Sequence, residues 1–184
     1  GAGIEEGELK PVFEDVFRDL YDGFTKADKF EVFPDVPQTL TQLHQKGVTL
    51  GIITNVRSLP IPHPSYHPRP AFSSPTNPLT HHQPTQSDDR TLQIIHSLSL
   101  HTYFTFILTS YACGLEKPDP RIFQEALRLA NLDDPRGAMH VGDHLERDYE
   151  GAIEAGWKAL IVDRGAERSG EGVVRSLEEL SEMC

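Results

Sequence analysis

The sequence predicts an α/β fold with a doubly wound, mostly parallel sheet and helices on both of its faces. Three observations support this prediction. Short apolar runs rich in β-branched and aromatic residues alternate with segments that carry apolar residues at helical spacing. The run 138–142 ends in Gly-Asp just before a helix-patterned segment, which is typical of a strand, a loop and a helix. With 184 residues, 38% of them hydrophobic, the chain is long enough for one domain with its own core.

The first elements expected are a helix and then a helix–strand unit. Residues 11–24 carry apolar side chains at 12, 13, 16, 17, 20, 21 and 24, which predicts an amphipathic helix. A turn over 33–37 leads to a helix over 38–45, which ends before a glycine. Residues 48–54 follow directly and form a continuous apolar, β-branched run, so we expect them to be a buried strand.

A Pro-rich segment over 58–89 interrupts this pattern. It contains eight prolines and many Ser, Thr, His and Gln residues. Such a segment buries too little apolar surface to offset its ordering entropy, so we expect a disordered surface insertion. Two alternatives remain open. The loop could contact a small adaptor domain, or it could form a metal site from its histidines, which are His63, His67, His81 and His82.

The second half of the chain resumes the alternation of helices and strands. The expected helices cover residues 90–98, 120–130, 149–155 and 173–183, and the expected strands cover residues 103–109, 138–142 and 158–163. Because helices link successive strands, we expect right-handed crossovers between parallel strands.

Charge and composition exclude several classes of partner. The net charge is −11 and no basic stripe is present, which argues against nucleic acid or an anionic membrane as a partner. No apolar run approaches the roughly 18 residues of a membrane-spanning helix. The two cysteines, Cys113 and Cys184, fit neither a metal site nor a disulfide framework, which favours a reducing, cytoplasmic setting. The first residue is glycine, so we expect a fragment or a processed product.

Two carboxylates mark a candidate metal site. Asp143 follows the predicted strand 138–142, and Asp148 stands five residues later at the start of the next helix pattern. Ligands of open α/β sheets bind beyond the carboxyl ends of the strands. Two carboxylates there suit Mg²⁺, which also takes water and phosphate oxygens as ligands. The alternative is a helix N-cap and a solvated charge.

A second group of side chains suits phosphate. Thr54 and Asn55 end the predicted strand 48–54, and their hydroxyl and amide groups can both bond a phosphate oxygen. Lys117 stands just before a Pro-flanked helix start, where it offers a point positive charge. Alone, the Thr-Asn pair would be a turn and the lysine a surface charge.

In this order, these segments resemble the haloacid-dehalogenase-like (HAD) hydrolase superfamily, most closely its phosphatase-type members with an inserted helical cap. The resemblance covers about residues 10–57 and 90–165. It rests on three motifs, which are Ile-Ile-Thr-Asn at 52–55, Lys-Pro-Asp-Pro-Arg-Ile-Phe at 117–123, and Val-Gly-Asp at 141–143 with Asp148 five residues on. It implies a Rossmann-like core and phosphoryl transfer through an aspartyl-phosphate intermediate.

The resemblance also implies a role for each matching residue. Thr54 and Asn55 would bond the phosphoryl oxygens, and Lys117 would neutralise the charge of the phosphate and the nucleophile. Asp143 would be a direct Mg²⁺ ligand, and Asp148 a second ligand or a residue that orients the first. His144 receives no role.

The chain departs from the family pattern in one respect. The family begins with a strand ending in Asp-x-Asp, which supplies the nucleophile and the general acid/base, and no Asp-x-Asp occurs in these 184 residues. Asp22-Gly23-Phe24-Thr25 is rejected as a substitute because it follows a helix pattern. The first strand, which in the family lies centrally between the strands 48–54 and 138–142, is thus expected to be missing. We expect negligible turnover by the chain alone, exposed strand edges and low stability.

The resulting division has four parts: a cap remnant over 1–33, a core over 34–57 and 90–170, an insertion over 58–89, and a C-terminal helix within 171–184. The preferred function is that of a HAD-like hydrolase, of the Mg²⁺-dependent type that acts on small phosphorylated substrates, N-terminally incomplete and inactive alone. A non-catalytic interaction protein is the alternative. A dehalogenase or phosphomutase of the same superfamily is a further one.

Overall fold

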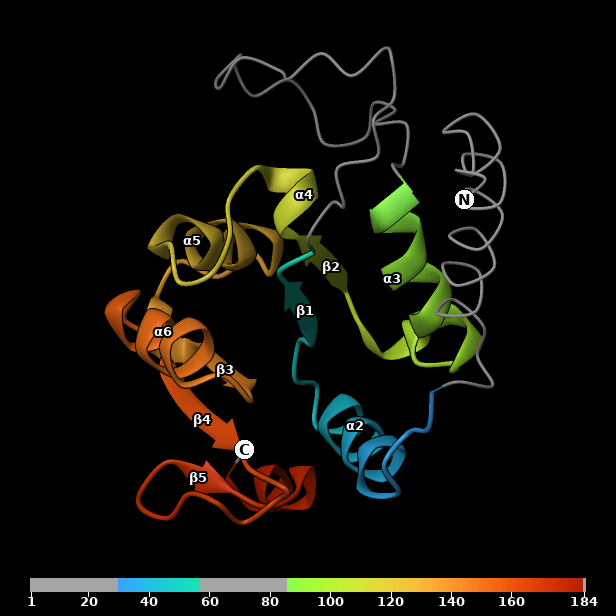
Figure 1. Cartoon of the computed structure of the whole chain (residues 1–184), viewed down its shortest axis with the longest axis vertical. Coiled ribbons are helices and arrows are strands. Elements are labelled where there is room, and N and C mark those ends of the chain that lie inside the picture. The colour runs from blue at the N-terminus through green and yellow to red at the C-terminus, as the bar shows by residue number, and fades with distance from the viewer. Residues whose placement is uncertain (1–29, 57–85, 184) are drawn as a thin grey trace, which may run out of the picture.

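The computed structural model of the protein describes residues 30–56 and 86–183 (Figure 1). The predicted helix over 11–24 and most of the predicted insertion over 58–89 lie outside these ranges. None of the helices in the described ranges has the length and hydropathy of a bilayer-spanning segment.

The described strands form two parallel sheets. Strand β1 (Gly51–Thr54) pairs in parallel with β2 (Phe106–Thr109). The second sheet has the order β3 (Met139–Gly142), β4 (Lys158–Val162) and β5 (Val173–Val174), again with parallel neighbours. These pairings confirm the predicted parallel α/β architecture.

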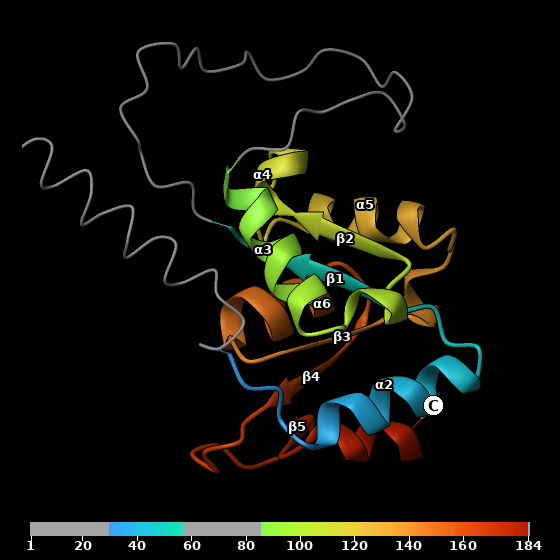
Figure 2. The same cartoon turned by 90° about the vertical axis from the view of Figure 1, so that its right-hand side faces the viewer.

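Helices cover both faces of these sheets. The helices are α2 (Asp35–Gln45), α3 (Gln86–Ser97), α4 (Ser110–Cys113), α5 (Pro120–Leu129) and α6 (Gly151–Glu154). Shorter 3₁₀ or π turns are η2 (His101–Tyr103), η3 (Pro135–Gly137), η4 (Leu145–Glu150) and η5 (Leu177–Glu182). Figures 1 and 2 show α3 on one face of the β1–β2 pair and α5 on the opposite face.

Helix α5 provides the centre of the hydrophobic core. Asp119 caps its first turn by accepting a hydrogen bond from the Arg121 N–H, and Pro120 occupies the first helical position, where a missing N–H costs nothing. Its apolar face is fully buried, as the spacing predicted, and comprises Ile122, Phe123, Ala126 and Leu127. This face contacts residues of both sheets, so a single core joins the two halves.

The break between the two sheets lies between β1 and β3. Lys117 Nζ is 2.9 Å from the Ile53 carbonyl oxygen on β1 and 3.5 Å from His140 Nε2 on β3, so both strands border the same gap. The Leu50 carbonyl accepts from Thr105 beside β2, and alternation along the strand directs the Ile53 backbone groups the other way, into the gap. No strand of residues 30–56 or 86–183 fills it. This is the position at which the family resemblance implies a missing strand.

The predicted C-terminal helix over 173–183 is wrong in its first part. Val173 and Val174 extend the second sheet by pairing with Ile161 and Val162 of β4. A 3₁₀ helix begins only at Leu177, where Ser176 and Glu179 form a capping box. The apolar spacing of this segment fits a helix, but pairing with β4 gives the two β-branched residues a buried place in the sheet.

Other boundaries move by a few residues. Helix α3 begins at Gln86, four residues before the predicted start, because the last proline of the insertion is at 84 and the backbone after it is free to join a helix. Strand β2 begins at Phe106 and not at 103, since η2 forms a tight turn before it. Asp148 lies inside η4 and not ahead of a helix.

A second connection between the two halves joins α2 to the C-terminal segment, which lie side by side in Figure 2. The buried Asp35 carboxylate accepts two hydrogen bonds from Arg164, at 3.0 and 2.8 Å, and one from the Leu177 N–H at 2.7 Å. The Arg164 guanidinium also lies 4.0 Å above the ring of Phe33. Since α2 leads into β1 while Leu177 follows β5, this clasp ties one sheet to the other.

The pKa of Asp35 is below its usual value of 3.8 in the folded protein. The hydrogen bonds from Arg164 are the largest cause, and they outweigh burial, which raises the pKa; the Leu177 N–H adds to the lowering. The carboxylate is therefore ionised at neutral pH.

Replacing Asp35 by asparagine should weaken the clasp. Asp35→Asn removes the charge that pairs with Arg164 and replaces one acceptor oxygen by a donor, so we expect the free energy of unfolding to fall by about 1–3 kcal/mol. Urea unfolding followed by circular dichroism measures this change. Asp134→Asn removes the carboxylate from the solvent-exposed Asp134–Arg136 pair and should cause no resolvable change. Equal effects of the two substitutions would contradict the clasp.

The clasp also predicts a pH dependence of stability. Because the folded pKa of Asp35 lies below its unfolded value, the unfolded chain binds more protons in that interval, and stability rises with pH there. The contribution is complete above about pH 4 and is lost as the pH falls through the folded pKa. Urea midpoints measured from neutral pH down to about pH 3 should fall less steeply for Asp35→Asn than for the wild type. Parallel curves would show that Asp35 makes no such contribution.

Candidate active site

The carboxyl ends of β1 and β3 meet around the side chain of Lys117. Its Nζ donates to Asp148 Oδ1 at 2.6 Å and to the Ile53 carbonyl at 2.9 Å, and it lies 3.5 Å from His140 Nε2. The side chains of Lys117 and Asp148 are only 10% and 7% exposed. An ion pair this well buried needs hydrogen bonds to its remaining atoms, and each partner here has them.

Asp148 holds the loop that follows β3. Its Oδ2 accepts the backbone N–H groups of Asp143 at 3.1 Å and His144 at 2.9 Å. A Cβ at position 142 would lie 2.4 Å from the Asp148 carboxyl group, so only glycine leaves room for it. The Gly-Asp pair and the aspartate five residues on are therefore one local structure.

The pKa of Asp148 lies well below its ordinary range. Burial alone would raise this pKa and is the largest single influence. The hydrogen bonds from His140 and Lys117, with a smaller contribution from the His144 N–H, together outweigh it. The carboxylate is thus held as an anion inside the protein.

Asn55 fixes the backbone of Lys117. Its Nδ2 donates to the Lys117 carbonyl at 2.8 Å, and its Oδ1 accepts from the Lys117 N–H at 2.9 Å. Both polar atoms of the Asn55 amide therefore bond the Lys117 backbone, much as a neighbouring strand would. The predicted phosphate contact of Asn55 stays a prediction, whereas its contact with Lys117 was not foreseen.

Thr54 ends β1 next to this network. The residues on either side of it, Ile53 and Asn55, both bond to Lys117, so Thr54 lies at the same edge. Its half-buried side chain has no hydrogen bond to any residue in the described ranges. Ser110 holds the chain two residues after Thr54, because its Oγ accepts from the Val56 N–H at 2.9 Å.

Asp143 differs from Asp148 in that it is exposed. Its backbone N–H is bonded to Asp148, but its carboxylate makes no hydrogen bond or ion pair within residues 30–56 and 86–183. No cluster of three potential metal-binding His, Cys, Asp or Glu side chains occurs in those same ranges. Of the two predicted Mg²⁺ ligands, Asp143 thus has a free carboxylate, while both oxygens of Asp148 are occupied by donors of the protein.

Two histidines near the site were not assigned a role by the sequence. His140 is buried in β3, bonds Asp148 Oδ1 at 3.2 Å and lies edge-on to Phe123. The signal for it was a single histidine inside an apolar strand. His144 caps η4, because its Nδ1 accepts from the Arg147 N–H at 3.2 Å.

A family model described as haloacid dehalogenase-like hydrolase matches residues 2–156. The chain belongs to this family. The matched range contains all five residues that the motifs singled out, and the structure places Asn55, Lys117 and Asp148 of this HAD-like hydrolase in direct contact.

Similar proteins share both sequence and fold with this HAD-like hydrolase. It is 31% identical over 163 residues to human haloacid dehalogenase-like hydrolase domain-containing protein 3, covering 88% of this chain and 50% of that protein. It is 28% identical to glyceraldehyde 3-phosphate phosphatase of Methanopyrus kandleri, over 77% of this chain and 47% of that protein. The chain spans about half the length of the curated relatives it matches.

Solved structures give the same architecture. A 2-haloacid dehalogenase from Pseudomonas syringae is 27% identical with a TM-score of 0.63, over 98% of this chain and 63% of that one. A HAD phosphatase from Thermococcus onnurineus has a TM-score of 0.65 at 24% identity, over 91% of this chain and 63% of that one. At 24% identity, the likeness to the Thermococcus onnurineus structure shows a shared fold and nothing more.

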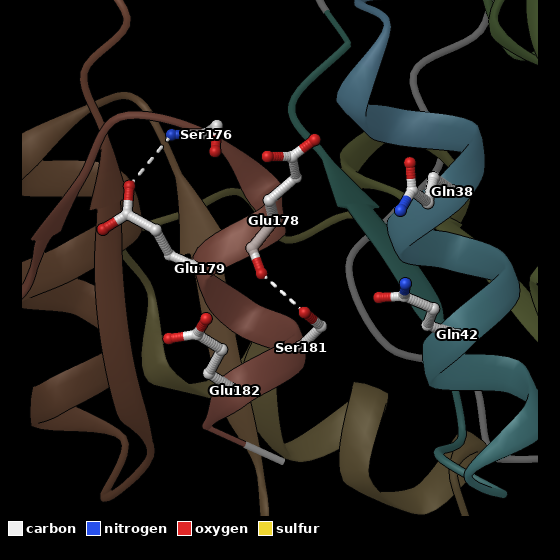
Figure 3. A pocket seen from close by; sticks show the side chains of 7 residues that line it. All are labelled: Gln38, Gln42, Ser176, Glu178, Glu179, Ser181 and Glu182. Atoms are coloured by element: carbon white, nitrogen blue, oxygen red, sulfur yellow. Dashed lines mark hydrogen bonds between the residues drawn. The ribbon is translucent and has the colours of Figure 1, made fainter.

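An open groove between α2 and η5 is separate from the Lys117 network (Figure 3). Its volume is about 360 Å³, and it is lined by Gln38, Gln42, Ser176, Glu178, Glu179, Ser181 and Glu182. None of these residues contacts the site described above. The carboxylate of Glu179 is already hydrogen-bonded within the protein, because its Oε1 accepts from the N–H groups of Arg175 and Ser176.

Removing the Asn55 amide should weaken the attachment of the Lys117 backbone, which depends on its two hydrogen bonds to Asn55. Asn55→Ala leaves the N–H and the carbonyl of Lys117 without their partners in a partly buried place, so we expect a loss of about 1–2 kcal/mol in the free energy of unfolding. Gln124→Ala removes an exposed amide on α5 and should cost about 0.5 kcal/mol or less. Urea unfolding measures the free energy of unfolding of both variants. Similar losses of that free energy would show that Asn55 does not hold the Lys117 backbone.

Proposed function

We propose that this chain carries the phosphate- and metal-binding half of a Mg²⁺-dependent phosphatase that acts on small phosphorylated substrates. The observation that supports this most is the buried Lys117 ammonium group, which bonds the carbonyl of Ile53 just before Thr54 and the carboxylate of Asp148. Asp148 in turn bonds the N–H of the exposed Asp143. Phosphoryl transfer depends mainly on positioning and on stabilising negative charge, and these groups provide for both.

Lys117 can still receive a phosphoryl oxygen. An ammonium group has three donors, and two of them make short hydrogen bonds to Ile53 and Asp148. The 3.5 Å contact with His140 is long for a hydrogen bond and competes weakly for the third. The Thr54 hydroxyl offers a further donor at the same edge.

The donor groups fit Mg²⁺ through Asp143. This ion commonly takes one or two carboxylates and completes its octahedron with water and phosphate oxygens. Asp143 is the free carboxylate, whereas Asp148 acts on it indirectly by fixing the backbone of residues 143 and 144. Bound Mg²⁺ supplies positive charge to the phosphoryl oxygens. In this proposal Asp148 orients the ligand, which is one of the two roles the sequence left open.

Relatives support a phosphate ester as the substrate. Two glyceraldehyde 3-phosphate phosphatases, from Methanopyrus kandleri and Methanothermobacter thermautotrophicus, are 28% and 29% identical to this chain. A free carboxylate beside a cationic side chain suits a metal-bound oxyanion better than it suits a halide leaving group. The chain alone is proposed to hydrolyse phosphate esters negligibly, because its 184 residues contain no Asp-x-Asp.

Binding of Mg²⁺ and orthophosphate tests this proposal without requiring turnover. The melting temperature of the full 184-residue chain should rise when both ions are present, and the rise should saturate. Asp143→Asn should abolish the Mg²⁺-dependent part of the rise, and Thr54→Val should weaken phosphate binding about tenfold. Asp133→Asn, which removes an exposed carboxylate outside the site, should leave both effects intact.

Three outcomes would count against the proposal. A melting temperature that ignores both ions would favour the non-catalytic interaction protein. Unchanged Mg²⁺ dependence in Asp143→Asn would remove the assigned ligand. Mg²⁺-dependent release of p-nitrophenol from p-nitrophenyl phosphate by the chain itself would refute its inactivity but leave the binding site in place.

A further inference from the structure

We infer that Arg168 binds a second negative group of the substrate and thereby selects phosphate esters that carry a carboxylate or a further phosphate. The inference rests on the proposed function, because it takes the first phosphoryl group to lie at Lys117 and Thr54. It assigns a binding role to a residue that none of the motifs includes.

Arg168 stands at the same end of the sheet as the candidate site. It lies in the loop that follows the carboxyl end of β4, and the ligands of α/β sheets bind at this end. Its Nη1 is 3.5 Å from the carbonyl oxygen of Asp143, whose N–H is bonded to Asp148. The guanidinium is therefore adjacent to the proposed metal ligand.

The backbone of Arg168 is fixed from both sides. The buried carboxylate of Asp163 accepts the Arg168 N–H at 2.5 Å. Arg175 donates to the Arg168 carbonyl, and it also bonds the Asp163 carbonyl at 3.0 Å and the Asp163 carboxylate at 2.8 Å. The pKa of Asp163 is lowered, first by the Arg168 N–H and, against the effect of burial, also by Arg175. The ion pair between the buried Asp163 carboxylate and the exposed Arg175 side chain thus holds Arg168, which is itself exposed, in a defined place.

The guanidinium of Arg168 keeps its donors available. Three arginines follow β4, and two of them are used within the protein, since Arg164 is paired with Asp35 and Arg175 with Asp163. In the described ranges Arg168 forms no ion pair, and its one side-chain hydrogen bond is the long one to the Asp143 carbonyl. Its charge also lowers the pKa of Asp163, but this is the smallest of the influences on that pKa. A guanidinium has five N–H donors arranged to fit a carboxylate or a phosphate.

A ligand that reaches from Lys117 to Arg168 must be negative at both ends. A phosphate monoester without a second anionic group would bond at Lys117 and Thr54 only, and it would leave Arg168 in water. A second oxyanion gains a charge-assisted hydrogen bond, which is about twice as strong as a neutral one. The expected substrate class is therefore that of short phosphate esters with a second oxyanion.

Calorimetric titration of the full chain with Mg²⁺ and three ligands of matched length tests this inference. The ligands are 2-hydroxyethyl phosphate, 2-phosphoglycolate and the bisphosphate of ethane-1,2-diol. The wild type should bind at least one of the two ligands that carry a second oxyanion group about tenfold more tightly than 2-hydroxyethyl phosphate. Arg168→Gln should abolish this preference and leave the affinity for 2-hydroxyethyl phosphate unchanged, and Arg168→Lys should restore part of it.

A matched control separates a local contact from net charge. Arg128→Gln removes an exposed arginine on α5 that is paired with Glu125, and it changes the net charge by the same amount. The preference should survive in this variant. A preference for only one of the two ligands with a second oxyanion group would support the inference and identify that group as a carboxylate or a phosphate.

The failures of the two proposals are distinguishable. If 2-hydroxyethyl phosphate binds but neither ligand with a second oxyanion group binds more tightly, or if the preference persists in Arg168→Gln, the inference is wrong and the proposed function stands. If none of the three ligands binds, both are wrong. Melting curves of each variant verify that the fold is intact.

Discussion

The contact between Lys117 and Asp148 joins two sheets that share no strand pairing in the described residues. Lys117 reaches from the segment before α5 to a carbonyl of β1 and to a carboxylate of η4. A buried ammonium and a buried carboxylate are each costly alone, and removing one leaves the other uncompensated. Loss of either side chain would therefore disturb the loops after β1 and β3 together. The same charged side chains that make the site able to bind an oxyanion also hold the loops after β1 and β3 in position.

A second constraint acts at the α2 side of the molecule. Asp35 and Arg164 connect the helix before β1 with the segment after β4, while the apolar face of α5 packs against residues of both sheets. The Asp35–Arg164 ion pair thus joins the two halves on the α2 side, and hydrophobic packing joins them through α5. This division explains how two short parallel sheets keep a defined relation although β1 and β3 do not pair.

The sequence predicted the parts of this structure that depend on local spacing. The buried face of α5 follows from apolar residues at helical intervals, and its start follows from the Pro-flanked segment before it, whereas the cap formed by Asp119 was found only in the structure. The grouping of Lys117, Asp143 and Asp148 followed from motifs whose order places them at strand ends. The role of Asn55 could not be predicted, because its partner stands 62 residues away and only the fold brings them together. Residues 173–174 were misassigned for a similar reason, since pairing with β4 overrides their apolar spacing.

Asp148 holds the loop after β3 through main-chain amides and touches neither the Asp143 nor the His144 side chain through its Oδ2. The backbone that Asp148 holds therefore does not depend on the side chain at 143, provided that residue 142 is glycine, whereas the His144 side chain still caps η4. The hydrogen bonds from main-chain amides to Asp148 thus set the backbone conformation of this loop, whereas the side chain at 143 sets which ligand it can bind. A loop held in this way can keep its backbone conformation while the side chain at 143 is exchanged. Solved structures with this architecture include both a phosphatase and a 2-haloacid dehalogenase.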